Sequence, residues 1–136
     1  MRYLIPVAAL IAPVLPAAAD EAPEAAIQSV IRQQIEAFRA GDIATAFGFA
    51  APAIQAMFGS ADRFGTMVRG GYPMVWHPAD LRFLDLTAVH GALWQMVLVK
   101  DEAGVWHRLA YRMEPDGKGG WLIAGVEILR APETAA

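Results

Sequence analysis

The feature that most constrains the fold is a change in the hydrophobic period of the chain. Between positions 27 and 68, apolar residues recur every three or four positions, which is the spacing of helices that bury one side. From Leu81 onward, apolar and polar residues alternate, which is typical of strands with one buried face. Helices followed by consecutive strands predict an α+β fold, in which N-terminal helices pack on a four-stranded antiparallel sheet.

Cap and turn residues divide the helical part into four segments. A long amphipathic helix spans 27–38. Asp42 can cap a second helix, and a short third segment follows at 53–58. Ser60 can cap the fourth helix, which we expect to end at the glycine pair 70–71.

The second part of the chain predicts strands at 81–89, 93–100, 105–114 and 121–129. Their connections are short and rich in Gly and Asp, so consecutive strands should pair as an antiparallel meander. Gly125 interrupts the last strand and predicts a bulge or bend at which the sheet curls. A curved sheet with helices on one side would be cone-like.

Residues 1–19 have the pattern of a cleavable secretory signal peptide, with a basic start, an apolar stretch and small residues before Asp20. A membrane anchor is the alternative, but a spanning helix needs about 20 apolar residues, and prolines interrupt this shorter stretch. We therefore expect a periplasmic or secreted protein. It should consist of a mobile leader at 20–25, a single domain at 26–130 and a disordered tail at 131–136.

Charge and residue usage exclude several classes of function. The chain has 11 Lys and Arg against 14 Asp and Glu, and loss of the signal peptide removes only Arg2, which leaves 10 against 14 and a net charge of −4. The basic residues are scattered, so we expect no nucleic-acid partner. The chain has no Cys, which excludes thiolate chemistry. His77, His90 and His107 lack the spacing of paired metal ligands, so we expect no metal and no cofactor.

Three short motifs carry a resemblance to a known family. They are AGD at 40–42, MVRGGYP at 67–73 and GWLIAG at 120–125. With them the chain resembles the bacterial exported domain-of-unknown-function family 4864, which is similar to the cone-shaped proteins of the nuclear transport factor 2-like class. The resemblance implies a cone-like fold. It leaves the activity open, because that class includes ketosteroid-isomerase-like and dehydratase-like enzymes as well as binding and assembly modules.

The candidate ligand-binding residues are Arg69, Tyr72, Trp76, His77, Gln95, His107 and Tyr111. The segment 72–78 begins and ends near prolines and is expected to be extended and to line the mouth of the cone. His107 and Tyr111 share the inward side of their strand, and Gln95 is a polar group among apolar ones, so each should need a partner or a cavity there. Arg69 before two glycines fits either a small anion site or a plain helix end.

Two other residues have alternative interpretations. Asp42 is either an inward general base, as in isomerase-like cones, or a helix N-cap, and its position after Gly41 favours the cap. Trp106 alternates outward with Arg108, which indicates either a partner surface or an indole covered by stacked arginine.

These observations lead to three hypotheses about function. The first is a non-catalytic module that binds a small apolar ligand or a protein partner. The second is an isomerase-like or dehydratase-like enzyme, with His77 or His107 as base and Tyr72 or Tyr111 as proton donor. The third is a structural homodimer formed through the outer face of the sheet, which includes Trp106. Contact with a membrane is not expected after signal cleavage.

Overall fold

The computed structural model describes residues 23–130. The predicted signal peptide, residues 20–22 of the leader and the tail at 131–136 lie outside the described residues. The elements are α1 Glu24–Arg39, α2 Ile43–Gly48, α3 Pro52–Phe58, α4 Ala61–Gly71, α5 Pro73–Trp76, β1 Asp80–Val89, β2 Ala92–Lys100, β3 Trp106–Pro115 and β4 Trp121–Leu129. Because α1 begins at Glu24, the last two residues of the predicted leader are helical.

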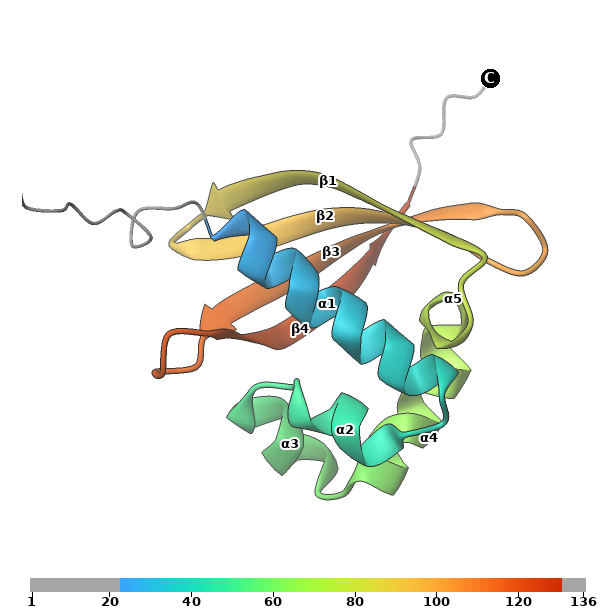
Figure 1. The fold of residues 1–136 in the computed structure, drawn as a ribbon, viewed down its shortest axis with the longest axis horizontal. Coiled ribbons are helices and arrows are strands. Elements are labelled where there is room, and N and C mark those ends of the chain that lie inside the picture. The colour runs from blue at the N-terminus through green and yellow to red at the C-terminus, as the bar shows by residue number, and fades with distance from the viewer. Residues whose placement is uncertain (1–22, 131–136) are drawn as a thin grey trace, which may run out of the picture.

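The predicted α+β fold is confirmed. The strands form one sheet in the order β1-β2-β3-β4, and each neighbouring pair is antiparallel. In Figure 1, α1 runs across one face of this curved sheet, while α2 to α4 gather on the β4 side. This arrangement of helices and open sheet is consistent with a cone.

The core lies between α1 and the middle of the sheet. Ile27, Ile31 and Ile35 of α1 are almost fully buried, as the helical period predicts. The facing positions on β2 and β3 are also buried and apolar, with Val97 and Leu109 paired in register. Burial of these side chains supplies most of the force that holds α1 on the sheet.

The helix ends follow the predicted capping. The Asp42 carboxylate accepts hydrogen bonds from the backbone N–H of Thr45 at 3.2 Å and from its hydroxyl at 2.7 Å. Ser60 accepts from the N–H of Arg63 at 3.2 Å. Asp42 is exposed, so it serves as the N-cap of α2 and does not project into the fold as a general base.

The segment after α4 differs from the prediction. We expected an extended stretch at 72–78, but Pro73–Trp76 forms α5, a single helical turn. Proline is favoured at the first position of a helix, because it has no N–H to leave unpaired and its φ is already helical. α4 itself ends at Gly71, within the glycine pair at which its end was predicted.

Two irregularities bend the sheet. Arg112 pairs with Gly125 whereas Met113 pairs with Ile123, so β4 has an extra residue at the predicted bend. β1 has a second irregularity between Phe83 and Leu86. Gly125 does not have a left-handed backbone, however, and a Cβ atom there would meet only Nε of Arg112 at 4.0 Å. The bend is therefore not a strained position that requires glycine.

The linker between α2 and α3 also joins the sheet. Ala50 forms an isolated parallel bridge to Ile123, in which the N–H of Ala51 donates to the Ile123 carbonyl at 2.8 Å and the N–H of Ile123 donates to the Phe49 carbonyl at 2.9 Å. This bridge joins the helical cluster, which consists of α2, α3 and α4, to the bulged part of β4.

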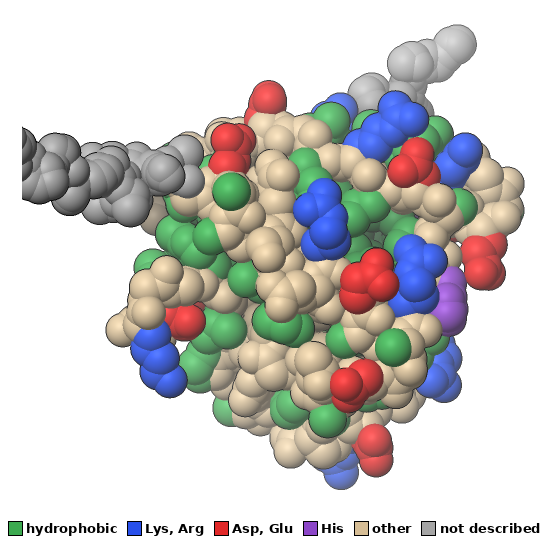
Figure 2. Space-filling model, viewed as in Figure 1, with side chains coloured by type: hydrophobic (Ala, Val, Ile, Leu, Met, Phe, Trp, Pro, Cys, Tyr) green, Lys and Arg blue, Asp and Glu red, His purple; other side chains and the backbone are tan. Residues whose placement is uncertain are grey.

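Charged side chains of both signs lie on the face of the molecule drawn in Figure 2. On this face, Lys and Arg side chains alternate with Asp and Glu. Within residues 23–130, no helix is both long and apolar enough to span a membrane.

Candidate functional site

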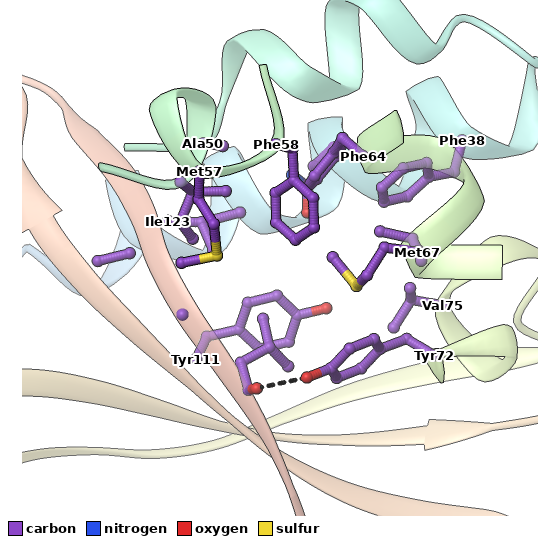
Figure 3. A pocket seen from close by; sticks show the side chains of 16 residues that line it. Phe38, Ala50, Met57, Phe58, Phe64, Met67, Tyr72, Val75, Tyr111 and Ile123 are labelled. Carbon is purple, nitrogen blue, oxygen red and sulfur yellow. Dashed lines mark hydrogen bonds between the residues drawn. The ribbon is translucent and has the colours of Figure 1, made fainter. Parts of the chain in front are cut away.

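A cavity of about 290 Å³ lies between the helical cluster and the β4 side of the sheet (Figure 3). Its walls come from α1, α3, α4 and α5 on one side and from β3 and β4 on the other. The cavity exists because α1 lies across the curved sheet, whereas α3 and α4 lie farther from the sheet. The bridge at Ala50 and the short helix α5 connect α3 and α4 to the rest of the fold. Ligand cavities in proteins start at about this size.

Aromatic rings form the helical wall of the cavity. Phe64 of α4 is the centre of this cluster, with its ring centroid 6.0 Å from that of Phe38, 5.2 Å from that of Phe47 and 5.9 Å from that of Phe58. Such offset and edge-on pairs are favourable and restrict how each ring can move. The shape of the cavity is therefore fixed mainly by packing.

The mouth of the cavity lies beside α3. Met57 lines the cavity and is 72% exposed, so its side chain stands at the boundary with solvent. α3 has no buried residue, although Ile54 and Phe58 pack against the core. This short helix is the least anchored part of the wall.

Among the described residues, three polar side chains line the otherwise apolar cavity: Gln34, Tyr72 and Tyr111. The Tyr72 hydroxyl donates to the backbone carbonyl of Val126 at 3.0 Å. Gln34 is 4% exposed, and its Nε2 donates to the carbonyl of Ala46 at 3.0 Å. Both side chains therefore fasten parts of the wall together.

Tyr111 is placed differently. It is only 1% exposed, and its hydroxyl points into the cavity, between Met67 and Tyr72 (Figure 3). Its hydroxyl has no hydrogen-bond partner in the described part of the chain, which spans residues 23–130. Burial, and to a smaller extent the neighbouring Tyr72, raises the pKa of the Tyr111 phenol. The hydroxyl therefore stays protonated and can donate a hydrogen bond.

Of the seven candidate residues, only Tyr72 and Tyr111 line this cavity. Trp76 does not line the cavity but stacks on Phe38, with ring centroids 5.1 Å apart. The Arg69 guanidinium lies 4.5 Å from the centre of the Trp76 ring. The two glycines after Arg69 are the last residues of α4, which favours the interpretation of this segment as a plain helix end.

The expectation that His107 projects into the cavity is wrong. His107 lies near the start of β3, where its Nε2 is 2.8 Å from Oδ2 of Asp101. Oδ1 of the same carboxylate accepts the N–H groups of Ala103 and Val105, both at 2.9 Å. The hydrogen bond from His107, together with those from the backbone, holds the pKa of the Asp101 carboxyl below its usual range. His107 thus closes the β2–β3 turn.

His77 and Gln95 also lie away from the cavity. His77 is exposed after the end of α5. Gln95 is fully buried, and its Nε2 donates at 2.9 Å to the carbonyls of Leu84 and Met96, beside the irregularity in β1. The predicted need for a partner is met on this nitrogen, whereas Oε1 has no partner among residues 23–130. Gln95 therefore fills an irregular part of the sheet.

Gln34 is a polar cavity residue that was not predicted from the sequence. It lies three positions after Ile31 and seven after Ile27, which places it on the buried stripe of α1. A polar residue on such a stripe is a detectable signal, because a buried amide needs partners. The contribution of α3 to the wall has no comparable signal in the sequence.

Tyr72 and Tyr111 are the titratable side chains that line the cavity within residues 23–130. Among the described residues that line it there is no His, Asp, Glu, Lys or Arg. The expected pairing of His77 or His107 with a cavity tyrosine is therefore not formed. No cluster of three or more potential metal ligands occurs within 23–130.

The outer face of the sheet carries Trp106, which is 37% exposed. The Arg82 guanidinium lies 4.9 Å and the Lys100 ammonium 5.5 Å from the centre of its indole ring. The indole is thus covered by cations, although the arginine comes from β1 and not from its neighbour on β3. A homodimer through this face remains a prediction.

Comparison with known proteins gives one assignment. No curated protein and no solved structure is significantly similar to the chain. The model of one family, described as a domain of unknown function (DUF4864), matches residues 20–136, which include the whole described fold. The chain therefore belongs to the DUF4864 family.

Proposed function

We propose that the protein binds a small, compact and mostly apolar molecule in the cavity between the helices and β4, without converting it. The observation that carries this proposal is a preformed cavity of about 290 Å³, whose walls, as far as the described residues 23–130 form them, are aromatic and aliphatic with three polar side chains. An engineered apolar cavity of about 150 Å³ binds benzene. A cavity of about twice that volume suits a two-ring molecule.

The composition of the wall supports binding over catalysis. General acid–base chemistry requires a group that exchanges a proton near the working pH. The lining residues include no carboxylate and no imidazole, and the Tyr111 phenol is held in its protonated form by burial. The isomerase-like and dehydratase-like alternatives therefore have no base in this cavity.

We also propose that the fold is related to the nuclear transport factor 2-like class and that the protein acts outside the cytoplasm. The first part is supported by α1 lying across a curved antiparallel sheet. The second is supported by the signal-peptide pattern of residues 1–19. Intact-mass measurement of the exported protein tests the second part, and a species that retains Met1 would refute it.

Binding can be tested with 2-ethylnaphthalene, a neutral two-ring probe, by isothermal titration calorimetry. We expect saturable binding to the wild-type protein and none to Val126→Phe, because Val126 lines the cavity and a larger ring would fill it. Ile128→Phe is the matched control, since Ile128 lies on the same strand but is exposed and does not line the cavity.

The two variants also separate loss of the site from loss of the fold. Both should unfold cooperatively at temperatures near that of the wild type. The proposed function is wrong if the wild-type protein does not bind the probe, or if a folded Val126→Phe variant binds it as tightly as the wild type.

A further inference from the structure

We infer that the cavity selects an uncharged molecule that presents one hydrogen-bond acceptor, such as a carbonyl oxygen, to the hydroxyl of Tyr111. This inference rests on the proposed function and adds the chemical class of the ligand. It is carried by the one hydroxyl in the cavity that the described structure leaves without a partner, and by the charges that are missing from the wall.

The Tyr111 hydroxyl is held in one place. Tyr111 lies in the middle of β3, paired with Gln95 on β2 and with Val126 on β4, so the backbone on both sides of it is fixed. Its ring is buried, and Figure 3 shows the hydroxyl directed between Met67 and Tyr72. A fixed donor in an apolar cavity recognises the position of an acceptor as well as its presence.

The other polar groups do not satisfy this hydroxyl. Tyr72 donates its proton to the carbonyl of Val126, and Nε2 of Gln34 donates to the carbonyl of Ala46. Within residues 23–130, the fully buried side-chain polar atom without a partner is Oε1 of Gln95, so the Tyr111 hydroxyl is accessible from the cavity that it lines. A ligand acceptor, or a water molecule that the ligand replaces, is therefore expected at this point.

The charge of the ligand is restricted by the same wall. Within residues 23–130, no Lys, Arg or His lines the cavity to neutralise a carboxylate, and no Asp or Glu lines it to neutralise an amine. Arg69, a cation on the same helix as Phe64, does not line the cavity, and its guanidinium lies over the Trp76 ring instead. A buried charge without a partner is strongly unfavourable, so a carboxylate or ammonium group should be rejected.

Three probes of the same ring system test the inference. 2-Acetylnaphthalene has a carbonyl acceptor, 2-ethylnaphthalene has none, and 2-naphthoate has a negative charge at neutral pH. Calorimetry should give a Kd for the ketone about 2- to 10-fold lower than for the hydrocarbon, the range expected for one neutral hydrogen bond. The carboxylate should bind more weakly than either neutral probe.

Two tyrosine variants assign the preference to one hydroxyl. Tyr111→Phe should bind the ketone and the hydrocarbon with equal affinity. Tyr72→Phe is the matched control, because it removes a hydroxyl from the same cavity that is already bonded to Val126. This variant should keep the preference for the ketone, even if both affinities fall.

The outcomes separate the two proposals. If the neutral probes bind but the wild-type protein does not distinguish ketone from hydrocarbon, the inference is wrong and the proposed function stands. The inference also fails if Tyr111→Phe keeps the preference, or if 2-naphthoate binds as tightly as the ketone. If no probe binds, both the proposed function and the inference are overturned.

Discussion

Two glycines of α4 test how tightly the helices around the cavity pack. A Cβ atom at Gly65 would lie 3.0 Å from Cγ2 of Ile43, the first residue of α2. Non-bonded carbon atoms are most favourable at about 3.5–4.0 Å, so an alanine at position 65 would push α2 and α4 apart or displace the Ile43 side chain. At Gly70, in the same helix, a Cβ atom would meet nothing within 4 Å.

The two substitutions should therefore have opposite effects on stability. Gly70→Ala should raise the free energy of unfolding by about 0.5–1 kcal/mol, because alanine loses less backbone entropy in a helix. Gly65→Ala has the same advantage, but overpacking costs about 1–3 kcal/mol. We expect a net loss of about 0.5–2 kcal/mol for this variant. Urea denaturation followed by tryptophan fluorescence measures both values.

A third substitution shows whether the cause is the contact with Ile43. Ile43→Leu removes the Cγ2 methyl group but keeps the volume of the side chain, so it should relieve the clash of Gly65→Ala. The double variant should be more stable than the sum of the single changes predicts, by about 1 kcal/mol. The packing argument is refuted if Gly65→Ala stabilises the domain as much as Gly70→Ala, or if the two substitutions are simply additive.

Three further predictions concern the sheet and its turns. His107→Leu should lower the melting temperature but leave binding of 2-ethylnaphthalene unchanged, because His107 bonds to Asp101 and does not line the cavity; loss of probe binding in the folded variant would contradict this. Gly125→Val should change the free energy of unfolding by no more than about 0.5 kcal/mol, since its backbone is not left-handed and its nearest neighbour atom is 4.0 Å away; a large drop in melting temperature would reveal strain there. The hydrogen bond from His107 and backbone N–H groups lower the pKa of Asp101, and backbone N–H groups lower that of Asp116. The unfolded chain therefore binds more protons in acid, and the stability from both carboxylates, complete at neutral pH, should be lost as the pH falls below about 4. Urea midpoints across this range should depend less on pH in Asp101→Asn and Asp116→Asn, and an unchanged dependence would argue against these turns as its source.

The elements of the fold were predictable because short-range patterns determine them. The alternation of apolar and polar residues predicted the ends of all four described strands to within one residue, because one face of the sheet is buried. Asp42 and Ser60 identified two helix starts, because their side chains satisfy backbone N–H groups only a few residues away. The one-turn helix α5 was missed, because four residues are too few to show a helical period.

The site was only partly predictable, because alternation gives the face of a strand but not what covers it. Tyr111 and His107 share one face of β3, yet only Tyr111 lies beneath the cavity, while His107 is near the end of the strand within reach of Asp101. The surroundings of Gln95 depend on an irregularity in the neighbouring strand, which no local signal in β2 indicates. The helices that cover Tyr111 come from a distant part of the chain, whereas the partners of His107 and Gln95 lie in the adjoining turn and the neighbouring strand.

The bridge between Ala50 and Ile123 has a consequence for the kinetics of folding. Every strand pairs with its neighbour in the chain, so the sheet can grow through local loops, whereas the bridge joins residues from opposite halves of the domain. Closing so long a loop is entropically costly, and we expect the bridge to form after the rate-limiting step. Ala50 and Ile123 both line the cavity, which is therefore completed late. A bound ligand should slow unfolding while leaving the folding rate almost unchanged.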